Sequence, residues 1–134
     1  MRGAARGLLA VGVGDTVSEA VPGIPYTTDW HGQPVGEERF HWVVAEAVLA
    51  AGALHTYTGQ ALYARLAERW WSEIDEHFVD AATGSWHHEL SPTMGPSSRT
   101  WHGKPDVYHA YNALTLPALP LAPTAAPTIS RLAR

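Results

Sequence analysis

The stretch EERFHWVVAEAVLAAGALHTYT, residues 37–58, decides the fold. Apolar residues recur in it at helical spacing on two faces, with small alanine and glycine residues between them. A helix that is apolar on both sides must be largely buried. Glu37 and Glu38 suit the positive end of a helix dipole, and Gly59 is a natural residue just after a helix end. We therefore predict a buried helix from about Glu37 to Thr58.

Two more helices are predicted on the C-terminal side of this stretch. From Gln60 to Ala82, an apolar stripe and a polar face indicate an amphipathic outer helix. Only Gly59, or Gly59 with Gln60, separates it from the buried helix, so the two should be antiparallel neighbours. A third helix should begin near Pro105–Asp106 and end by Pro117, because proline and aspartate suit a first helical turn.

The remaining segments are rich in proline and glycine, which predicts irregular chain with short strands. Tyr26–Trp30 and Ser85–Leu90 have the composition of such strands. Residues 1–20 could form a short helix that several glycines weaken. Residues 122–134 contain Pro123 and Pro127, and we expect them to form a loosely ordered tail.

The order of elements is buried helix, amphipathic helix, irregular segment, buried helix. Repeated, this order builds a toroid of inner and outer helices. The chain holds about one and a half such pairs, too few to cover both faces of the inner helices. This predicts an all-α fold that is part of a larger domain, and we expect exposed inner helices to drive self-association.

Composition limits the class of protein. The 134 residues are 46% hydrophobic and 16% charged, which is a globular balance, and the net charge of −4 includes no basic block. We therefore expect no nucleic-acid partner. With no cysteine, disulfides and thiolate metal sites are excluded. No apolar run approaches the roughly 20 residues that span a bilayer, so we expect no membrane partner.

The first 20 residues resemble a weak signal peptide. Arg2 and Arg6 precede the short apolar stretch 8–11, but Gly12 and Gly14 interrupt the apolar part and Asp15 follows closely. We therefore predict a cytoplasmic protein rather than an exported one.

The densest group of chemically active residues is Trp101-His102-Gly103-Lys104-Pro105-Asp106-Val107-Tyr108-His109. His109 should lie in the first turn of the third helix, where backbone N–H groups favour a neutral imidazole. A neutral imidazole is what a general base needs near pH 7. We therefore take His109 as a candidate catalytic residue. The alternative is a helix-capping loop with a partly buried histidine.

A second group lies at the N-terminal end of the buried helix. Trp42 and Glu46 are four residues apart and so share one face. A carboxylate beside an indole on an apolar face needs a partner. Sugar hydroxyls would serve, with the sugar ring stacked on Trp42. A lysine or arginine inside the core would serve equally well, and the spacing does not decide between them.

The third group is Trp86-His87-His88-Glu89. Histidine and glutamate ligate zinc and manganese, but on a strand His87 and Glu89 face one way and His88 the other. We therefore expect a structural or sugar-lining role here and no metal site.

Four motifs resemble one family, in order and in spacing. They are Tyr26-Thr27-Thr28-Asp29-Trp30, His41-Trp42-Val43-Val44-Ala45-Glu46-Ala47, Gly84-Ser85-Trp86-His87-His88-Glu89-Leu90 and the 101–109 group. Together they are similar to the N-acylglucosamine 2-epimerase superfamily, in its branch of mannose and other aldose–ketose isomerases.

The resemblance implies the C-terminal part of an (α/α)6 barrel, with short β-hairpin segments in its loops, over residues 1–134. It also implies proton transfer through an enediol next to the carbonyl of a monosaccharide, with two histidines and with no metal or other cofactor. His109 matches one histidine, and Trp42, Glu46 and Trp101 match residues that line the sugar site. Lys104 and Asp106 lie in the same motif and are assigned support roles in substrate binding.

This chain is much shorter than members of that family. The second histidine and a substrate-binding arginine would precede it, so we expect the isolated chain to be inactive. Two other readings stay open. A glycoside hydrolase on a similar toroid would need paired carboxylates, for which Glu46, Glu89 and Asp106 are candidates. A sugar-binding remnant without catalysis is the other.

Overall fold

The computed structural model describes residues 4, 7, 9–10, 22–122 and 126–132. Its elements are β1 (Thr27–Thr28), β2 (Pro34–Gly36), β3 (Arg39–Phe40), α2 (His41–Thr58), α3 (Ala61–Glu73), η1 (Ile74–Phe78), β4 (Glu89–Leu90), β5 (Pro96–Ser97), α4 (Tyr108–Thr115), η2 (Leu116–Ala118) and α5 (Ala126–Leu132). Here η1 is a π-helical turn and η2 a 3-10 turn. The predicted helix-rich fold with short strands is therefore confirmed for this part of the chain.

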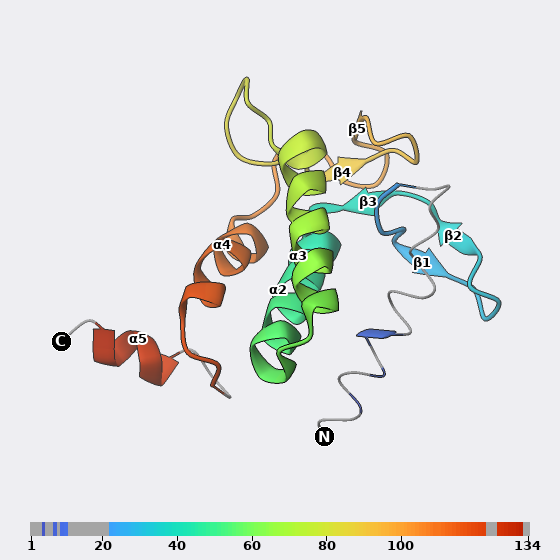
Figure 1. The fold of residues 1–134 in the computed structure, drawn as a ribbon. Helices are drawn as coiled ribbons and strands as arrows, with labels where there is room; N and C mark the ends of the chain where they lie inside the picture. The colour runs from blue at the N-terminus through green and yellow to red at the C-terminus, as the bar shows by residue number, and fades with distance from the viewer. Residues whose placement is uncertain (1–3, 5–6, 8, 11–21, 123–125, 133–134) are drawn as a thin grey trace.

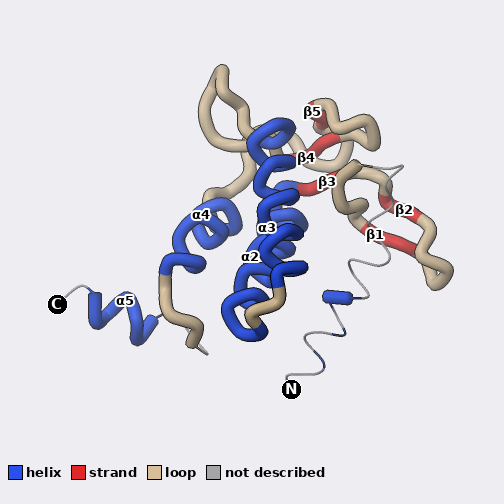
Figure 2. Tube along the Cα trace, in the orientation of Figure 1, coloured by secondary structure: helices blue, strands red, loops and turns tan. Residues whose placement is uncertain are grey.

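Helix α2 is the centre of the fold, with α3 packed along it and α4 beside it (Figures 1 and 2). Its buried positions follow helical spacing, which is why this stretch forms the core stripe. The main hydrophobic cluster consists of Val44, Ala45, Val48, Ala51, Trp70, Ile74, Phe78, Trp86, Leu90, Met94 and Ala113. The core thus joins α2 to α3, η1, β4 and α4, and the N-terminal end of α2 is held against the strands.

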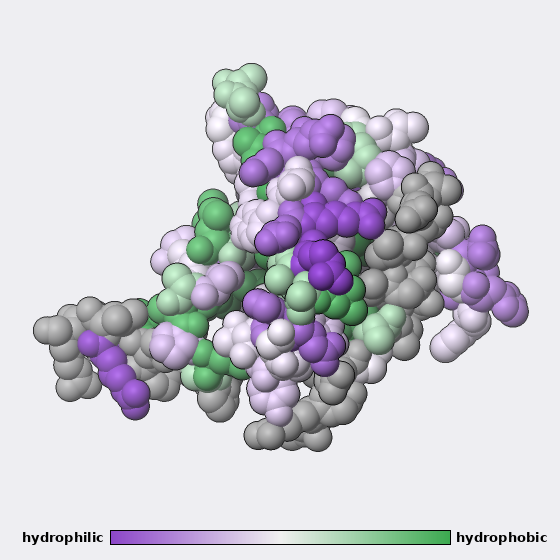
Figure 3. All heavy atoms as spheres, in the orientation of Figure 1, coloured by the Kyte–Doolittle hydropathy of each residue, from purple (hydrophilic) through white to green (hydrophobic). Residues whose placement is uncertain are grey.

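Helix α3 is amphipathic, as its sequence predicts. Trp70 is buried, and η1 continues its apolar stripe with buried Ile74 and Phe78. The face of α3 turned toward the viewer is hydrophilic in Figure 3. Arg69 and Glu73 form an ion pair between successive turns of this helix. The short link that begins at Gly59 makes α2 and α3 antiparallel neighbours.

Two small antiparallel sheets flank the N-terminal end of α2. One pairs β1 with β2, and the other has the order β3, β4, β5. In the second sheet Phe40 lies opposite Glu89. Because α2 begins directly after β3, this register places His41 next to His88, and the backbone N–H of His41 donates to the carbonyl of His88 at 3.3 Å.

The predicted start of the first helix was wrong by four residues. The helix begins at His41 because Arg39–Phe40 pairs with β4 instead of coiling. Glu37 and Glu38 therefore precede a strand and do not lie at the helix end. The predicted C-terminal end is confirmed, since Gly59 follows Thr58 in the left-handed conformation with φ 69°.

The second and third helices are shorter than predicted. The second ends in η1 at Phe78, and Val79 instead forms an antiparallel bridge with Trp86. The third begins at Tyr108, two or three residues after the predicted Pro105–Asp106 start. Its C-terminal end agrees with the prediction, because Pro117 already lies in η2.

At both chain ends the structure describes only some of the residues for which the sequence makes a prediction. Most of residues 1–20 lie outside the described residues, although positions 4, 7 and 9–10 are helical. Within the predicted tail 122–134, α5 is described, and residues 123–125 and 133–134 are not. Loose ordering of the tail stays a prediction. No helix in the described part of the chain combines the length and hydropathy needed to cross a bilayer.

Candidate functional site

The site is organised around a pair formed by Glu46 and His109. The Nδ1 atom of His109 lies 2.9 Å from Oε1 of Glu46, across 63 residues of sequence. Helix α2 supplies the carboxylate and the first turn of α4 supplies the imidazole. The side chains are 50% and 27% exposed respectively, so the pair lies at the surface and is open to a ligand. The partner of Glu46 is therefore a histidine near the surface, and not a lysine or arginine inside the core.

Rings from two helices and two loops continue from this pair as a row. We call Trp42, His109, His41, His88 and Trp101 the aromatic row. Its successive ring centroids are 6.0, 6.0, 5.1 and 5.8 Å apart. The last contact, between His88 and Trp101, is a stacked one with 19° between the planes. The row is therefore a continuous chain of ring contacts beside the carboxylate–imidazole pair, with His41 buried in its middle.

His41 is the buried member of the row. Its side chain is only 1% exposed, and burial lowers its pKa from 6.5 to about 4. The ring Nδ1 lies 3.3 Å from the His88 carbonyl oxygen, while Nε2 has no hydrogen-bond partner among the described residues. At neutral pH the ring is therefore uncharged, and it acts as a wall behind His109 rather than as a second charged group.

Lys104 and Asp106 are both engaged by other residues of the chain in this structure. The ammonium group of Lys104 pairs with Asp80, and this hydrogen bond, followed by that from Thr83, lowers the pKa of Asp80 well below its usual value. Oδ1 of Asp106 accepts a hydrogen bond from the backbone N–H of Tyr108 at 2.8 Å. Both residues thus shape the approach to α4, and their roles in substrate binding stay predictions.

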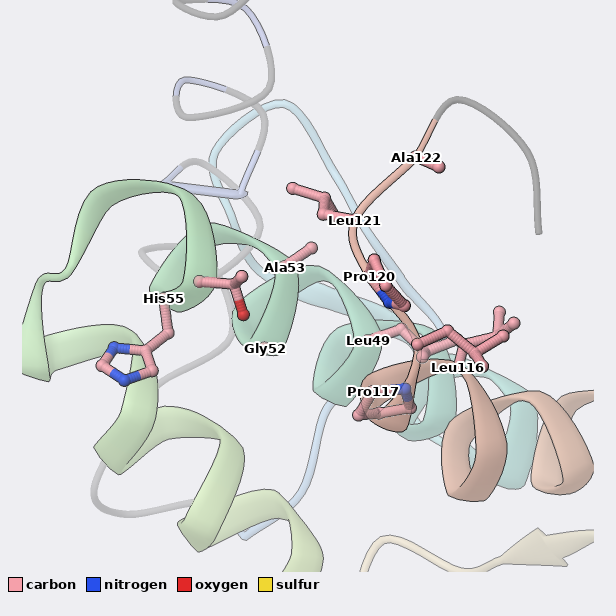
Figure 4. Close-up of a pocket in the computed structure, with 11 residues that line it drawn as sticks. Leu49, Gly52, Ala53, His55, Leu116, Pro117, Pro120, Leu121 and Ala122 are labelled. Carbon is pink, nitrogen blue, oxygen red and sulfur yellow. The ribbon is translucent and has the colours of Figure 1, made fainter. Parts of the chain in front are cut away.

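A separate apolar cavity of about 450 Å³ lies at the other end of α2 (Figure 4). It is formed between the C-terminal half of α2 and residues 116–122, and Leu49, Pro117 and Leu121 are among its lining residues. Its polar side chains are His55 and Thr56. It contains none of the residues that the sequence selects for chemistry, so we place the candidate site at the aromatic row.

A family model described as N-acylglucosamine 2-epimerase (GlcNAc 2-epimerase) matches residues 1–113. The chain belongs to the N-acylglucosamine 2-epimerase family. It is 50% identical over 109 residues to a D-mannose isomerase of Thermobifida fusca, covering 81% of this chain and 27% of that protein. It is 45% identical over 114 residues to a D-mannose isomerase of Pseudomonas cannabina pv. alisalensis, covering 85% and 28%. The chain thus spans little more than a quarter of these relatives.

Solved structures of the N-acylglucosamine 2-epimerase family share the fold. A crystal structure of D-mannose isomerase superposes with a TM-score of 0.72 at 21% identity, over 82% of this chain and 28% of that one. A cellobiose 2-epimerase from Spirochaeta thermophila DSM 6192 gives 0.57 at 23% identity, over 69% and 24%. These structures show the shared fold, and the family resemblance is confirmed by the family model and the two relatives.

Two features of the site in this N-acylglucosamine 2-epimerase family chain were not predicted from the sequence. The sequence marks His41 only as the start of a motif, although the buried ring joins His109 to His88. It also gives Glu89 no partner, although this carboxylate accepts four hydrogen bonds from the segment Ser97–Trp101. The sequence around Glu89, Ser85-Trp86-His87-His88-Glu89-Leu90, is itself polar and gives no signal that this carboxylate is buried. The described residues contain no group of three or more side chains suited to hold a metal ion.

Proposed function

We propose that this chain supplies part of the active site of a sugar isomerase or epimerase, in which His109 transfers a proton at the carbon next to the sugar carbonyl. The observation that carries the proposal is the 2.9 Å contact between His109 Nδ1 and Glu46. A carboxylate that accepts from Nδ1–H fixes the tautomer of the ring and leaves Nε2 with its lone pair free. That is the arrangement that a general base needs.

The chemistry follows from that free lone pair. Nε2 of His109 takes the proton from the second carbon of an aldose. The electron pair of the broken C–H bond forms the double bond of an enediol, and the carbonyl oxygen gains a proton. Return of a proton to the first carbon, with loss of the proton on the second oxygen, gives the ketose. Return to the opposite face of the second carbon gives the epimer instead.

The identity of the substrate is proposed from the relatives and from the ring surface. The two D-mannose isomerases are 50% and 45% identical to this chain, which favours conversion of mannose to fructose. Half-buried Trp42 borders the catalytic pair and gives one face of a sugar ring an apolar surface. Trp101 extends this surface from the far end of the row. Asp106 and Lys104 are proposed as support residues that order the loop before His109.

The fold similarity supports a further part of the proposal. Helices α2 and α4 take the place of inner helices and α3 that of an outer helix in the C-terminal part of an (α/α)6 barrel. The second acid–base group that the enediol route requires is not assigned to a described residue. His41 is unsuited to that role because it is only 1% exposed and has a pKa of about 4.

A glycoside hydrolase is disfavoured by Glu89. Hydrolysis needs two carboxylates that face the bond to be cleaved. Glu89 is fully buried, and both of its oxygens are occupied by hydrogen bonds. This leaves Glu46 paired with a histidine and Asp106 bound to a backbone N–H, which fits proton transfer better than hydrolysis.

A chimeric enzyme tests the proposal directly. The segment of the Thermobifida fusca D-mannose isomerase that aligns with this chain is replaced by the present sequence, and conversion of mannose to fructose is followed in D2O. We expect an active chimera that incorporates deuterium at the reacting carbon. His109→Asn should lower kcat by about 10²- to 10⁴-fold, the usual contribution of a general acid–base group. Glu46→Gln should lower it by about 10- to 100-fold, as loss of an orienting carboxylate does.

The control in the chimera is His102→Gln, which removes an exposed histidine in the same loop and should leave kcat unchanged. An active chimera whose His109→Asn variant keeps its kcat would refute the role of His109. Release of a smaller sugar from a glycan, without deuterium incorporation, would instead support the hydrolase. A chimera that binds mannose but does not turn it over would support a sugar-binding function without catalysis.

A further inference from the structure

Glu89 is a buried charge whose partner is not another charge. Its side chain is 0% exposed, in strand β4. None of the ion pairs in the described part of the chain includes it. A carboxylate in such a place costs free energy unless hydrogen bonds replace its water. The hydrogen-bond donors that replace water therefore identify the part of the chain that Glu89 binds.

All four donors come from one short segment. Oε1 accepts from the hydroxyl of Ser97 at 2.6 Å and from the backbone N–H of Arg99 at 2.9 Å. Oε2 accepts from the backbone N–H groups of Thr100 at 2.9 Å and Trp101 at 3.1 Å. Burial opposes ionisation of Glu89, but these four bonds outweigh it and lower its pKa. The carboxylate is therefore ionised at neutral pH and binds the segment through both oxygens.

The segment depends on these bonds for its shape. No helix or strand is present in residues 98–107, so no carbonyl groups of a sheet accept from the backbone N–H groups at the start of this segment. The carboxylate of Glu89 accepts from them instead. The Trp101 side chain is 53% exposed, so core packing does not hold it. Its ring contact is the stacked one with His88, at 5.8 Å between centroids. Two adjacent residues thus hold Trp101, with Glu89 binding its backbone and His88 its ring.

The same strand ties Trp101 to the catalytic pair. Glu89 lies opposite Phe40 in the sheet, and the next residue after Phe40 is His41. The His41 ring contacts both His88 and His109. We propose that Glu89 is a positioning residue, which fixes Trp101 against His88 and so completes the ring surface on which the sugar rests. The sugar part of this statement rests on the proposed function, whereas the fixing of Trp101 does not.

The test uses the full 134-residue chain and the variant Glu89→Gln. The amide oxygen can still accept from the N–H groups of Thr100 and Trp101, and the amide nitrogen can donate to the Ser97 hydroxyl, but it cannot accept from the N–H of Arg99 and the negative charge is lost. We expect the indole NMR signal of Trp101 to sharpen toward that of a mobile side chain. The ring protons of His88 should lose the shift that the stacked indole causes. Trp101→Phe assigns the signals, and circular dichroism checks that the helices persist.

Two other variants make the result specific. Asp29→Asn is a matched control, because that carboxylate also accepts two backbone N–H groups in an exposed loop, those of His31 and Gln33. It should leave the Trp101 and His88 signals unchanged. Ser97→Ala removes one donor and leaves the buried carboxylate in place, so it should move both signals in the same direction but less far. It serves as the test if Glu89→Gln fails to fold.

Mannose titrations of the same samples test the functional part. Glu89→Gln and Trp101→Ala should weaken mannose binding by similar factors of about two- to tenfold, the range expected for one aromatic contact. Unchanged Trp101 and His88 signals in both Glu89→Gln and Ser97→Ala would overturn the proposal. A mobile Trp101 with unchanged mannose affinity would also overturn it. If the isolated wild-type chain binds no mannose, the same variants are titrated in the chimera with the Thermobifida fusca enzyme, and the NMR signals decide whether Glu89 positions Trp101.

Discussion

His41 offers the sharpest quantitative prediction, because its ring is buried and yet titratable. Burial lowers its pKa from 6.5 to about 4, which outweighs the effect of the nearby His88 carbonyl. A difference of one pH unit corresponds to 1.36 kcal/mol, so protonating this ring in the folded chain costs about 3 kcal/mol more than in the unfolded chain. At pH 7 only about one ring in a thousand is protonated.

The sign of the pH effect follows from which state binds the proton first. The unfolded chain takes up a proton on His41 near pH 6.5, whereas the folded chain does so only near pH 4. The stabilising contribution is therefore complete above pH 6.5 and is lost as the pH falls to 4. We expect the free energy of unfolding of the wild type to fall by about 3 kcal/mol more than that of His41→Gln between pH 7 and pH 4.

Urea denaturation at a series of pH values measures this difference, and NMR titration of the His41 ring gives the midpoint directly. His102→Gln is the control, because it removes an exposed imidazole, and its curve should follow that of the wild type. Parallel wild-type and His41→Gln curves, or a His41 midpoint near 6.5, would refute the argument that burial keeps this ring neutral.

Two further predictions concern other parts of the chain. Gly59→Ala should destabilise the fold by about 1 kcal/mol in urea denaturation, because φ is 69° there and no atom lies within 4 Å to compensate. An unchanged midpoint would contradict the left-handed cap. Lys104→Met should raise the pKa of Asp80 in a carboxyl NMR titration, because Lys104 is the largest cause of its low value. Thr83→Val should raise it less, and the reverse order would show that the ion pair is not the main cause.

The helices could be predicted because their signals are local. The apolar stripe of α2 and the glycine after Thr58 are patterns of neighbouring residues, so this helix and its C-terminal end were predicted correctly. The N-terminal end was wrong because Arg39–Phe40 pairs with a strand about fifty residues later, which no local pattern reveals. The π-helical turn before Val79 has the same origin, since Val79 is taken up by its bridge to Trp86.

The candidate site was predicted in part for a related reason. His109, Trp42 and Glu46 were selected as residue types that suit sugar chemistry, and the structure places His109 in contact with both of the others. The hydrogen bonds of Glu89 could not be predicted, because its donors are backbone N–H groups of an irregular loop. Periodicity reports which side chains face a core, and it carries no information on where loop amides point.

The contacts between motifs give the strongest physical reason to treat these residues as a site. Tyr26 of the first motif contacts Trp42 of the second at 6.1 Å between ring centroids. His41 of the second contacts His88 of the third, and His88 stacks on Trp101 of the fourth.

Four members of the main hydrophobic cluster, Val44, Ala45, Trp86 and Leu90, belong to the motifs, and the other seven lie outside them. Residues needed only for packing would be expected in that cluster. The rings of Tyr26, Trp42, His41, His88, Trp101 and His109 and the carboxylate of Glu46 instead contact one another at the N-terminal end of α2. Polar and aromatic side chains that meet outside the hydrophobic cluster are what a ligand site requires.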